Sequence, residues 1–599
     1  MRVAESGSAQ STFVATLVDE WVRCGITDAV VCPGSRSTPL VLALLARGEI
    51  RLHVRLDERG AGFYAIGLAL GSNRVPIVCT TSGTAAAELH PSVVEAHLGR
   101  IAIILCTADR PFELHHVGAP QSIDQTNLYS NAVRWFAEPG LQDGSEASRR
   151  SWRSLADRAF YEATSGPVGP GPVHLNLAFK EPLNFEPGPL PNTANSLDEP
   201  KISLHSPAPA LSHSALASSR TWLGRRGVII AGAGCGPIGD VIELSVLLSW
   251  PVLADPRSRC RVRHPNVIAS TDSIFRSNDA LDALEPQVVL SLGSPWASRS
   301  IADYTRRAGS AGAQIVAVDP WWRWVDPDRI VTDVHRCDPS AWLSATRALL
   351  AGGDSDRITQ DCGLAGEWLG RWKRVDLVAQ EALDTVLAQD CADRDGALSE
   401  PTLARHLLTL VPDDTKVVVS SSMPIRDLEC YTPALHSPPE VLSNRGANGI
   451  DGVCSTAIGV AASNASVVAL LGDLAFLHDV SALVTAATHP VSTRCVIVVI
   501  DNHGGAIFSF LPQVNDLDKA SFERLFTTPQ APSVTAVASG FGLRALDVHT
   551  LGGLDSELNA ALNQEGISVI RAIVPGVEEN ASLHQRINDF VTNAIESAL

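Results

Sequence analysis

The part of the chain between residues 466 and 505 restricts the possible folds most strongly. Two apolar runs, residues 466–471 and 495–500, have the composition of fully buried strands, and the polar residues Asp473 and Asn502 come directly after them. Residues 478–488, between the two runs, have helical spacing. This strand–helix–strand order predicts two parallel strands whose polar residues lie at the carboxyl edge of the sheet, where such folds bind ligands.

The polar groups expected at this edge suit a hard divalent cation. Asp473 offers a carboxylate, Asn502 offers an amide oxygen, and the turn at Gly504 and Gly505 offers backbone carbonyls. Mg²⁺ prefers oxygen ligands and usually shares its coordination shell with substrate phosphates. The alternative is an ordinary strand–helix–strand unit with acidic turn residues.

Length and charge exclude several classes of protein. At 599 residues the chain is too long for a single core, so several domains are expected. The formal net charge is −18 and no basic stretch occurs, which argues against a nucleic-acid partner. Since no signal-type segment or apolar run of membrane-spanning length is present, we expect no membrane association and a cytoplasmic protein. The 12 cysteines contain no Cys-x-x-Cys pair and are expected to be reduced.

Apolar strand-like runs alternate with helical segments, which predicts the α/β class with parallel sheets. Three such blocks are expected to form domains, at residues 1–185, 220–350 and 398–599. Residues 186–219 are rich in proline and serine and are expected to be a linker, whereas residues 351–397 are expected to be a connecting helical segment. The strands are expected at residues 29–32, 76–81, 101–108 and 172–177, at 228–231, 288–292 and 315–318, and at 417–420, 466–471, 495–500 and 569–574.

The second block contains a glycine-rich turn, GAGCG at residues 232–236, directly after an expected strand. Pro237 stands where the third glycine of the dinucleotide-binding fingerprint belongs. We therefore interpret this sequence as a tight strand–helix turn.

Two stretches of the first block carry chemical groups. In CPGSRSTPL, residues 32–40, Ser35 and Arg36 lie at an expected helix start, where hydroxyls, backbone N–H groups and a guanidinium make a natural carboxylate site. A well-capped helix with a surface arginine is the alternative. In DERGAGFYAIGLAL, residues 57–70, Glu58 opens a glycine-rich helix whose small residues allow close packing, as at a subunit interface. An exposed first-turn glutamate is the alternative there.

These motifs together resemble thiamine-diphosphate enzymes, which join a pyrimidine-binding, a middle and a diphosphate-binding domain. The spacing from Gly472-Asp473 to Asn502 is similar to their diphosphate motif. The resemblance implies that Asp473, Asn502 and the Gly504 carbonyl bind Mg²⁺ or Mn²⁺, and that Glu58 is catalytic by bonding N1′ of the aminopyrimidine. The residues implied to contact the cofactor are Glu58, Ile450, Gly472, Asp473, Asn502, Gly504 and Ile507.

Within that family, the motifs are most similar to the synthases of menaquinone biosynthesis. The resemblance rests on CPGSRSTPL, DERGAGF, TADRP, the GAPQ turn, NRGANGIDG, GDLAFLHD and GGAIFSFLP. It implies decarboxylation of 2-oxoglutarate and 1,4-addition of the resulting succinyl carbanion to isochorismate. Because these substrates carry four carboxylates, arginines should orient them. The implied substrate contacts are Ser35, Arg36, Arg110, Gln121, Arg299, Ser422, Arg426, Arg445, Phe508 and Leu511.

Three positions depart from that pattern. Arg299-Ser300 stands where the family has two basic residues, and Pro120 stands where asparagine is usual. His115-His116 is similar to the histidine pair of simple 2-oxoacid decarboxylases, although adjacent loop histidines usually face solvent.

Two alternative functions remain open from the sequence. One is another thiamine-diphosphate lyase or carboligase acting on 2-oxoacids, such as a decarboxylase or an acetolactate-type synthase. The other is a binding protein on a retired enzyme scaffold. The resemblance also implies a homodimer or a dimer of dimers with active sites at the subunit interface.

Overall fold

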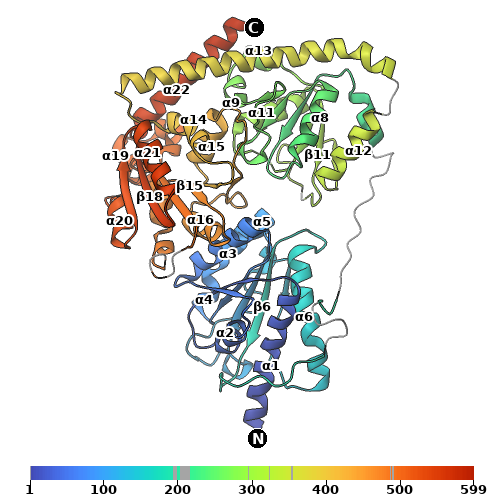
Figure 1. Cartoon of the computed structure of the whole chain (residues 1–599), viewed down its shortest axis with the longest axis vertical. Coiled ribbons are helices and arrows are strands. Elements are labelled where there is room, and N and C mark those ends of the chain that lie inside the picture. The colour runs from blue at the N-terminus through green and yellow to red at the C-terminus, as the bar shows by residue number, and fades with distance from the viewer. Residues whose placement is uncertain are drawn as a thin grey trace.

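The computed structural model describes the backbone of residues 2–192, 199–202, 216–294, 296–322, 324–351, 355–485, 488 and 491–599. Each of the three expected blocks forms a six-stranded sheet in which all neighbouring strands are parallel, with helices packed around it (Figure 1). The α/β class and the three parallel-sheet domains predicted from the sequence are confirmed.

The first domain has the strand order β2-β1-β3-β4-β6-β5. Its strands are β1 (Asp28–Val31), β2 (Arg51–Val54), β3 (Ile77–Thr80), β4 (Ile103–Asp109), β5 (Trp135–Ala137) and β6 (Pro172–Ala178). Its helices are α1 (Arg2–Arg23), α2 (Thr38–Leu45), α3 (Glu58–Ser72), α4 (Thr84–Glu88), α5 (His90–Gly99) and α6 (Glu146–Thr164).

The middle domain has the order β12-β11-β10-β7-β8-β9. Its strands are β7 (Gly227–Ala231), β8 (Val252–Ala254), β9 (Val267–Ile268), β10 (Val288–Leu292), β11 (Gln314–Val318) and β12 (Asp333–His335). Its helices are α8 (Ile238–Leu248), α9 (Thr271–Ile274), α10 (Asn278–Ala283), α11 (Arg299–Ser310) and α12 (Pro339–Ala351).

The third domain has the order β14-β13-β15-β16-β18-β17. Its strands are β13 (Lys416–Val419), β14 (Val441–Leu442), β15 (Val467–Gly472), β16 (Arg494–Asp501), β17 (Arg544–Val548) and β18 (Gly566–Ile573). Its helices are α14 (Glu400–Leu410), α15 (Met423–Tyr431), α16 (Val453–Ala462), α17 (Asp473–His478), α18 (Gln513–Asp516), α19 (Lys519–Phe522), α20 (Val534–Gly540), α21 (Leu551–Leu562) and α22 (Val577–Ala598).

The connecting segment is one long helix, α13 (Ser355–Asp393), which lies across the middle and third domains (Figure 1). Trp368 and Trp372 of α13 are buried in a hydrophobic cluster that both domains share. The expected linker contains neither helix nor strand in its described residues up to 202, whereas Leu216 and Trp222 already belong to the middle-domain core. The middle domain therefore begins a few residues before the expected boundary.

The first domain contacts the third through α3 and α16, which share a further hydrophobic cluster. A Cβ at Gly67 would lie 2.1 Å from the Thr456 carbonyl oxygen, and one at Gly459 would lie 2.2 Å from that of Tyr64. Close packing by the glycine-rich helix was expected, and in this structure its partner is a helix of the same chain.

The turn at Gly232 is hydrogen-bonded to the loop that follows β10. Its N–H donates to the Leu292 carbonyl at 2.9 Å, and Ser294 N–H donates to the Ala233 carbonyl at 2.8 Å. A Cβ at Gly232 would lie 1.7 Å from the Ser294 carbonyl oxygen. This agrees with a tight structural turn at residues 232–236.

The prediction of a helix at residues 478–488 is wrong. The helix α17 ends at His478, and a 3-10 turn, Val480–Leu483, follows. The reason is Asp479, which is fully buried and accepts hydrogen bonds from the backbone N–H and the hydroxyl of Ser455 on α16, at 2.7 and 3.1 Å. The chain turns inward to make these bonds. The expected range also includes residues 486 and 487, which lie outside the described residues.

Candidate active site

Asp473 and Asn502 lie at neighbouring positions on the carboxyl edge of the third sheet. Strands β15 and β16 pair in parallel with Gly472 opposite Ile500, so the two strands end at nearly the same height along the sheet. This is the arrangement that the strand–helix–strand pattern predicted.

Asp473 is a buried carboxylate with few bonding partners. Its side chain is 6% exposed, and Oδ1 accepts a hydrogen bond of 2.8 Å from the N–H of Leu474. Burial, reinforced by the negative charge of Asp501, raises the pKa of Asp473 to about 7. A cation at this position would reverse that shift, because it favours the charged form of the carboxyl group.

Asn502 presents a buried oxygen that lacks a partner. Its Nδ2 donates to Oε1 of Glu400 at 2.6 Å, and Oδ1 is buried without a hydrogen bond from any described residue. A buried amide oxygen of this kind costs free energy unless a donor or a cation satisfies it. A metal ion is such a partner.

Gly504 completes the edge with its backbone. Its φ is +130°, and a Cβ there would lie 2.2 Å from the Thr527 carbonyl oxygen, so only glycine fits. Its N–H faces Asp473, and its carbonyl accepts from Ala506 N–H at 3.0 Å, which leaves one lone pair. Among the described residues no group of three or more His, Cys, Asp or Glu side chains could hold a metal. One carboxylate, one amide oxygen and one carbonyl fit a Mg²⁺ ion that also binds a diphosphate.

Further along the same edge lie two predicted arginines. Arg426 is on α15, one turn after Ser422, and donates to the Ser422 carbonyl at 2.5 Å. Arg445 follows β14 and is half-buried; its Nε is buried without a hydrogen-bond partner among the described residues. Burial, then the nearby Arg257, lowers the pKa of Arg445.

The Arg445 loop is fixed by a carboxylate of the first domain. Glu95 on α5 is 2% exposed, and its two oxygens accept from the N–H groups of Gly446 and Ala447, each at 2.7 Å. Burial raises the pKa of Glu95 in spite of these bonds. This contact connects the loop that carries Arg445, a predicted substrate-binding residue, to the first domain.

Sequence reasoning missed a buried charge cluster beside Arg445, formed by Arg257 and Asp255 of the middle domain and Glu429 of α15 in the third domain. Arg257 pairs with Asp255 at 2.5 Å, and Glu429 accepts from Ala297 N–H at 2.7 Å. Burial, then the charge of Asp255, raises the pKa of Glu429 to about 8. No motif pointed to these residues. Arg257 and Asp255 are only two residues apart, but Glu429 is 132 residues from Ala297.

Arg299 does not join this group. Its side chain is 92% exposed at the start of α11 and pairs with Asp303 at 3.5 Å. The next residue, Ser300, donates to buried Asp272. In the single chain α11 directs Arg299 to solvent, so its assignment to the site stays a prediction; Arg257 is a middle-domain cation whose charge does act on Arg445.

The first domain brings two predicted arginines together. Arg36 follows β1 and donates to the Phe179 carbonyl at 3.0 Å, while Arg110 follows β4 and donates to the Ser82 hydroxyl. Each arginine is 8% exposed. Burial, then Arg36, lowers the pKa of Arg110, so an anion between the two guanidinium groups would be favoured. Ser35 is exposed beside them.

Glu58 is the first residue of α3 and is half-buried. Its neighbour Asp57 caps the helix by accepting from Arg59 N–H at 3.0 Å. Burial raises the pKa of Glu58, and the charges of Asp57 and Glu88 add to the effect. This environment differs from that of an exposed first-turn glutamate.

The remaining predicted residues differ in exposure. Ile450 and Leu511 are 37% and 40% exposed, and Gln121 is exposed with φ +53°. Ile507 and Phe508 are half-buried in a 3-10 turn, Ala506–Phe510, and Phe508 packs against Phe526.

The two adjacent histidines differ from each other. His116 is exposed, as expected, but His115 has an 18% exposed side chain and a 2.9 Å hydrogen bond with the Arg110 carbonyl. His115 therefore hydrogen-bonds the backbone of Arg110, a predicted substrate-binding residue.

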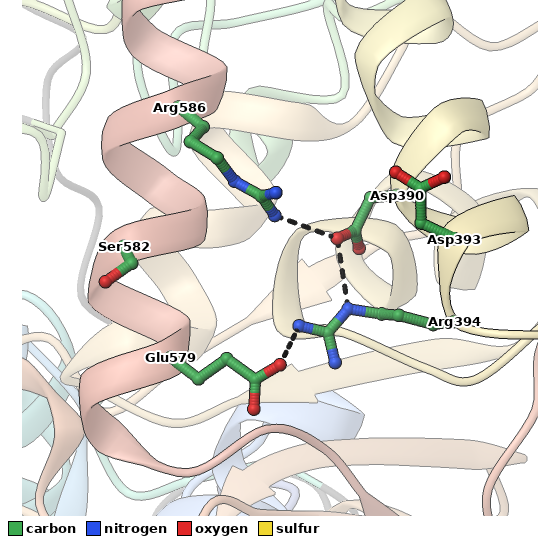
Figure 2. Close-up of a pocket in the computed structure, with 6 residues that line it drawn as sticks. All are labelled: Asp390, Asp393, Arg394, Glu579, Ser582 and Arg586. Atoms are coloured by element: carbon green, nitrogen blue, oxygen red, sulfur yellow. Dashed lines mark hydrogen bonds and ion pairs between the residues drawn. The ribbon is translucent and has the colours of Figure 1, made fainter.

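A cavity of about 390 Å³ lies elsewhere, between the end of α13 and the helix α22 (Figure 2). Asp390 accepts from Arg394 at 3.0 Å and from Arg586 at 3.2 Å, and Arg394 also pairs with Glu579. None of the predicted site residues lines it. These ion pairs connect α13 to α22.

Profiles of thiamine-enzyme domains match all three parts of the chain. Residues 11–128 match the thiamine pyrophosphate enzyme N-terminal TPP binding domain, residues 199–419 the middle domain of thiamine pyrophosphate, and residues 429–572 the C-terminal TPP binding domain. A solved structure with similar fold is described as a putative thiamin diphosphate-dependent enzyme from Mycobacterium smegmatis. It has a TM-score of 0.66 and 19% identity, and the match covers 94% of this chain and 99% of that one.

Curated relatives match over nearly the full length. Proteins named 2-succinyl-5-enolpyruvyl-6-hydroxy-3-cyclohexene-1-carboxylate synthase are 33% identical in Listeria innocua, 35% in Geobacillus kaustophilus and 38% in Thermobifida fusca. The matches cover 98%, 99% and 93% of this chain and 98%, 99% and 98% of the relatives. In the described part of the chain, no helix is both long and apolar enough to cross a bilayer.

Proposed function

This chain belongs to the family of thiamine-diphosphate-dependent 2-succinyl-5-enolpyruvyl-6-hydroxy-3-cyclohexene-1-carboxylate synthases, and we propose that the carboxyl edges of its first and third sheets form the active site. The enzyme is a transferase of menaquinone biosynthesis. It decarboxylates 2-oxoglutarate and adds the remaining four-carbon unit to isochorismate. When bound, thiamine diphosphate supplies the carbanion chemistry for both steps.

The observation that carries the assignment of the diphosphate end is the unsatisfied oxygen of Asn502 beside the buried carboxylate of Asp473. Together with the Gly504 carbonyl these groups would hold Mg²⁺ or Mn²⁺. The Cβ position of Gly472 is open space, which would leave room for the diphosphate beside the backbone. The apolar side chains of Ile450 and Ile507 would contact the cofactor.

Glu58 would hold a proton at N1′ of the aminopyrimidine. A carboxyl group with a raised pKa suits this task, because it exchanges a proton near neutral pH more readily than an exposed glutamate. The closely packed α3 and α16 fix its position.

The arginines would bind and orient the substrate carboxylates. Planar guanidinium groups make paired hydrogen bonds to carboxylates, which fixes orientation as well as affinity. Two groups are available, one in the first domain and one at the Arg445 loop. The residues we assign to substrate binding are Ser35, Arg36, Arg110, Gln121, Ser422, Arg426, Arg445, Phe508 and Leu511.

We further propose a cytoplasmic homodimer or dimer of dimers whose active sites lie at the subunit interface. Leu45 and Leu56, which are 65% and 63% exposed, offer apolar surface beside the first-domain edge strand. None of the described cysteines forms a disulfide, which suits a reducing compartment. Sedimentation of an active monomer would contradict the proposed assembly.

The test of the function is the loss of isochorismate absorbance with Mg²⁺ and thiamine diphosphate. We expect the loss only when 2-oxoglutarate is present, and not when pyruvate replaces it. If isochorismate persists while CO₂ evolves from a 2-oxoacid, the protein is another lyase or carboligase of this cofactor. If neither occurs with folded protein, the enzyme assignment fails.

A further inference from the structure

A buried carboxylate lies directly behind the proposed metal site. Glu400 is 1% exposed, and its Oε1 accepts hydrogen bonds from Nδ2 of Asn502 at 2.6 Å and from Nδ2 of Asn580 at 3.0 Å. It is separated from Asn502 by 102 residues. No sequence motif marked Glu400 as part of the site.

The backbone on either side of Glu400 is anchored by hydrogen bonds. Glu400 is the first residue of α14, whose N-terminus is capped by Ser399, and Leu398 N–H donates to the His549 carbonyl at 2.8 Å. A negative side chain at a helix N-terminus is favoured by the helix dipole. The carboxylate therefore has a fixed place from which it can orient a neighbour.

The contact decides which way the Asn502 amide faces. The amide nitrogen of Asn502 donates to Glu400 in the structure, so it is the nitrogen that faces this carboxyl group. Burial raises the pKa of Glu400, and the hydrogen bond from Asn502 opposes that shift because it stabilises the charged form, which only accepts hydrogen bonds. The oxygen then lies on the other side of the amide group, where it is buried and without a partner in the described part of the chain. If the amide were reversed, two oxygens would meet and the metal would lose a ligand.

We propose that Glu400 is a positioning residue of the metal site, which holds the Asn502 amide with its oxygen free to bind Mg²⁺ or Mn²⁺. Partners of this kind typically change metal affinity by roughly 10–100-fold when they are removed. The inference rests on the proposed role of Asn502 as a metal ligand.

A neighbouring carboxyl group provides a matched control. Asp427 on α15 is 1% exposed and lies beside Glu400, and its Oδ1 is 3.8 Å from Nε2 of His584. No hydrogen bond connects its side chain to Asn502 in the structure. Replacing Asp427 removes a buried carboxyl group from the same network without touching the metal ligand.

The experiment measures the dissociation constant of Mn²⁺ from the full-length protein with saturating thiamine diphosphate, by electron paramagnetic resonance of the free ion. E400L, which has similar volume but no acceptor, should bind Mn²⁺ about tenfold or more weakly. E400Q should lose only a few-fold, about threefold, because its amide oxygen can still accept from Asn502. D427N should bind about as tightly as the unmodified protein.

Several outcomes would overturn the inference. It fails if E400L binds Mn²⁺ normally, or if D427N weakens binding as much as E400L, since the effect would then belong to the buried network in general. Should E400L not fold, as judged by circular dichroism and gel filtration, E400A also removes the acceptor and tests the same prediction, with an expected loss of about tenfold or more. N502A separates the two proposals: normal Mn²⁺ binding by N502A removes Asn502 from the metal ligands, whereas weak binding by N502A and normal binding by E400L removes only the role of Glu400.

Discussion

The first and third domains have the same strand order, yet the polar residues at their sheet edges have opposite character. After the third strand of each sheet stand Ser82 in the first domain and Asp473 in the third, and after the fourth stand Arg110 and Asn502. In the first domain Arg110 donates to Ser82, a pair that suits an anion. In the third domain a carboxylate and an unsatisfied oxygen suit a cation. The common topology fixes where a ligand binds, and the side chains decide which ligand it is.

The largest expected effect comes from removing the proposed cation site of the third domain. Asp473→Asn removes the only charged group that we assign to the cation, so kcat/KM should fall by about a hundredfold or more. The measurement is turnover over a range of Mg²⁺ concentrations, together with Mn²⁺ binding. Full activity at ordinary Mg²⁺ would show that the carboxylate does not bind the metal.

The second effect tests the catalytic residue of the first domain. Glu58→Gln keeps the volume and the helix start but cannot exchange a proton, so kcat should fall by roughly 10²–10⁴-fold. Thiamine diphosphate affinity, measured by calorimetry, should change little, because the diphosphate end lies in the third domain. Near-normal turnover would exclude Glu58 from the mechanism.

The third effect concerns the anion-binding character of the first domain. Arg110→Ala removes a charge-assisted contact to a substrate carboxylate, so KM for 2-oxoglutarate or isochorismate should rise roughly 10–100-fold. Arg299→Ala is the matched control. Its side chain is 92% exposed, and we expect both KM values to stay within about twofold. Equal effects of the two substitutions would show that Arg299 belongs to the site, as the sequence predicted.

The smallest effect concerns the packing between the two domains at α16. Burial raises the pKa of Asp479 to about 7 from an ordinary value of 3.8. Because the folded-state pKa is the higher one, its contribution to stability is fully present below pH 3.8 and is lost as the pH rises to about 7. The apparent melting temperature should therefore fall by roughly 2–4 °C more between pH 5.5 and 8 in the unmodified protein than in Asp479→Asn. Identical pH profiles would show that Asp479 does not titrate in this range.

The sequence predicted the three sheets and most of the edge positions, because both depend on local patterns. An apolar run of strand length followed by a polar residue identifies a sheet edge without knowledge of the rest of the chain. Asp473, Asn502 and Arg110 were placed in this way. The prediction of a helix after residue 478 was wrong because Asp479 accepts a hydrogen bond from Ser455 of α16. A contact with a distant segment of this kind leaves no trace in the local spacing of apolar residues.

What the sequence determined by itself is therefore the fold class, the domain order, the family and the residues at the strand ends. Only the tertiary structure decided which buried polar groups meet. Glu400 contacts Asn502 across 102 residues, Glu95 bonds the Arg445 loop from another domain, and Arg257 of the middle domain lies close enough to Arg445 to lower its pKa. The physical reason is that a polar group buried by packing must find a partner, and the partner comes from whichever distant segment the packing brings within hydrogen-bonding distance.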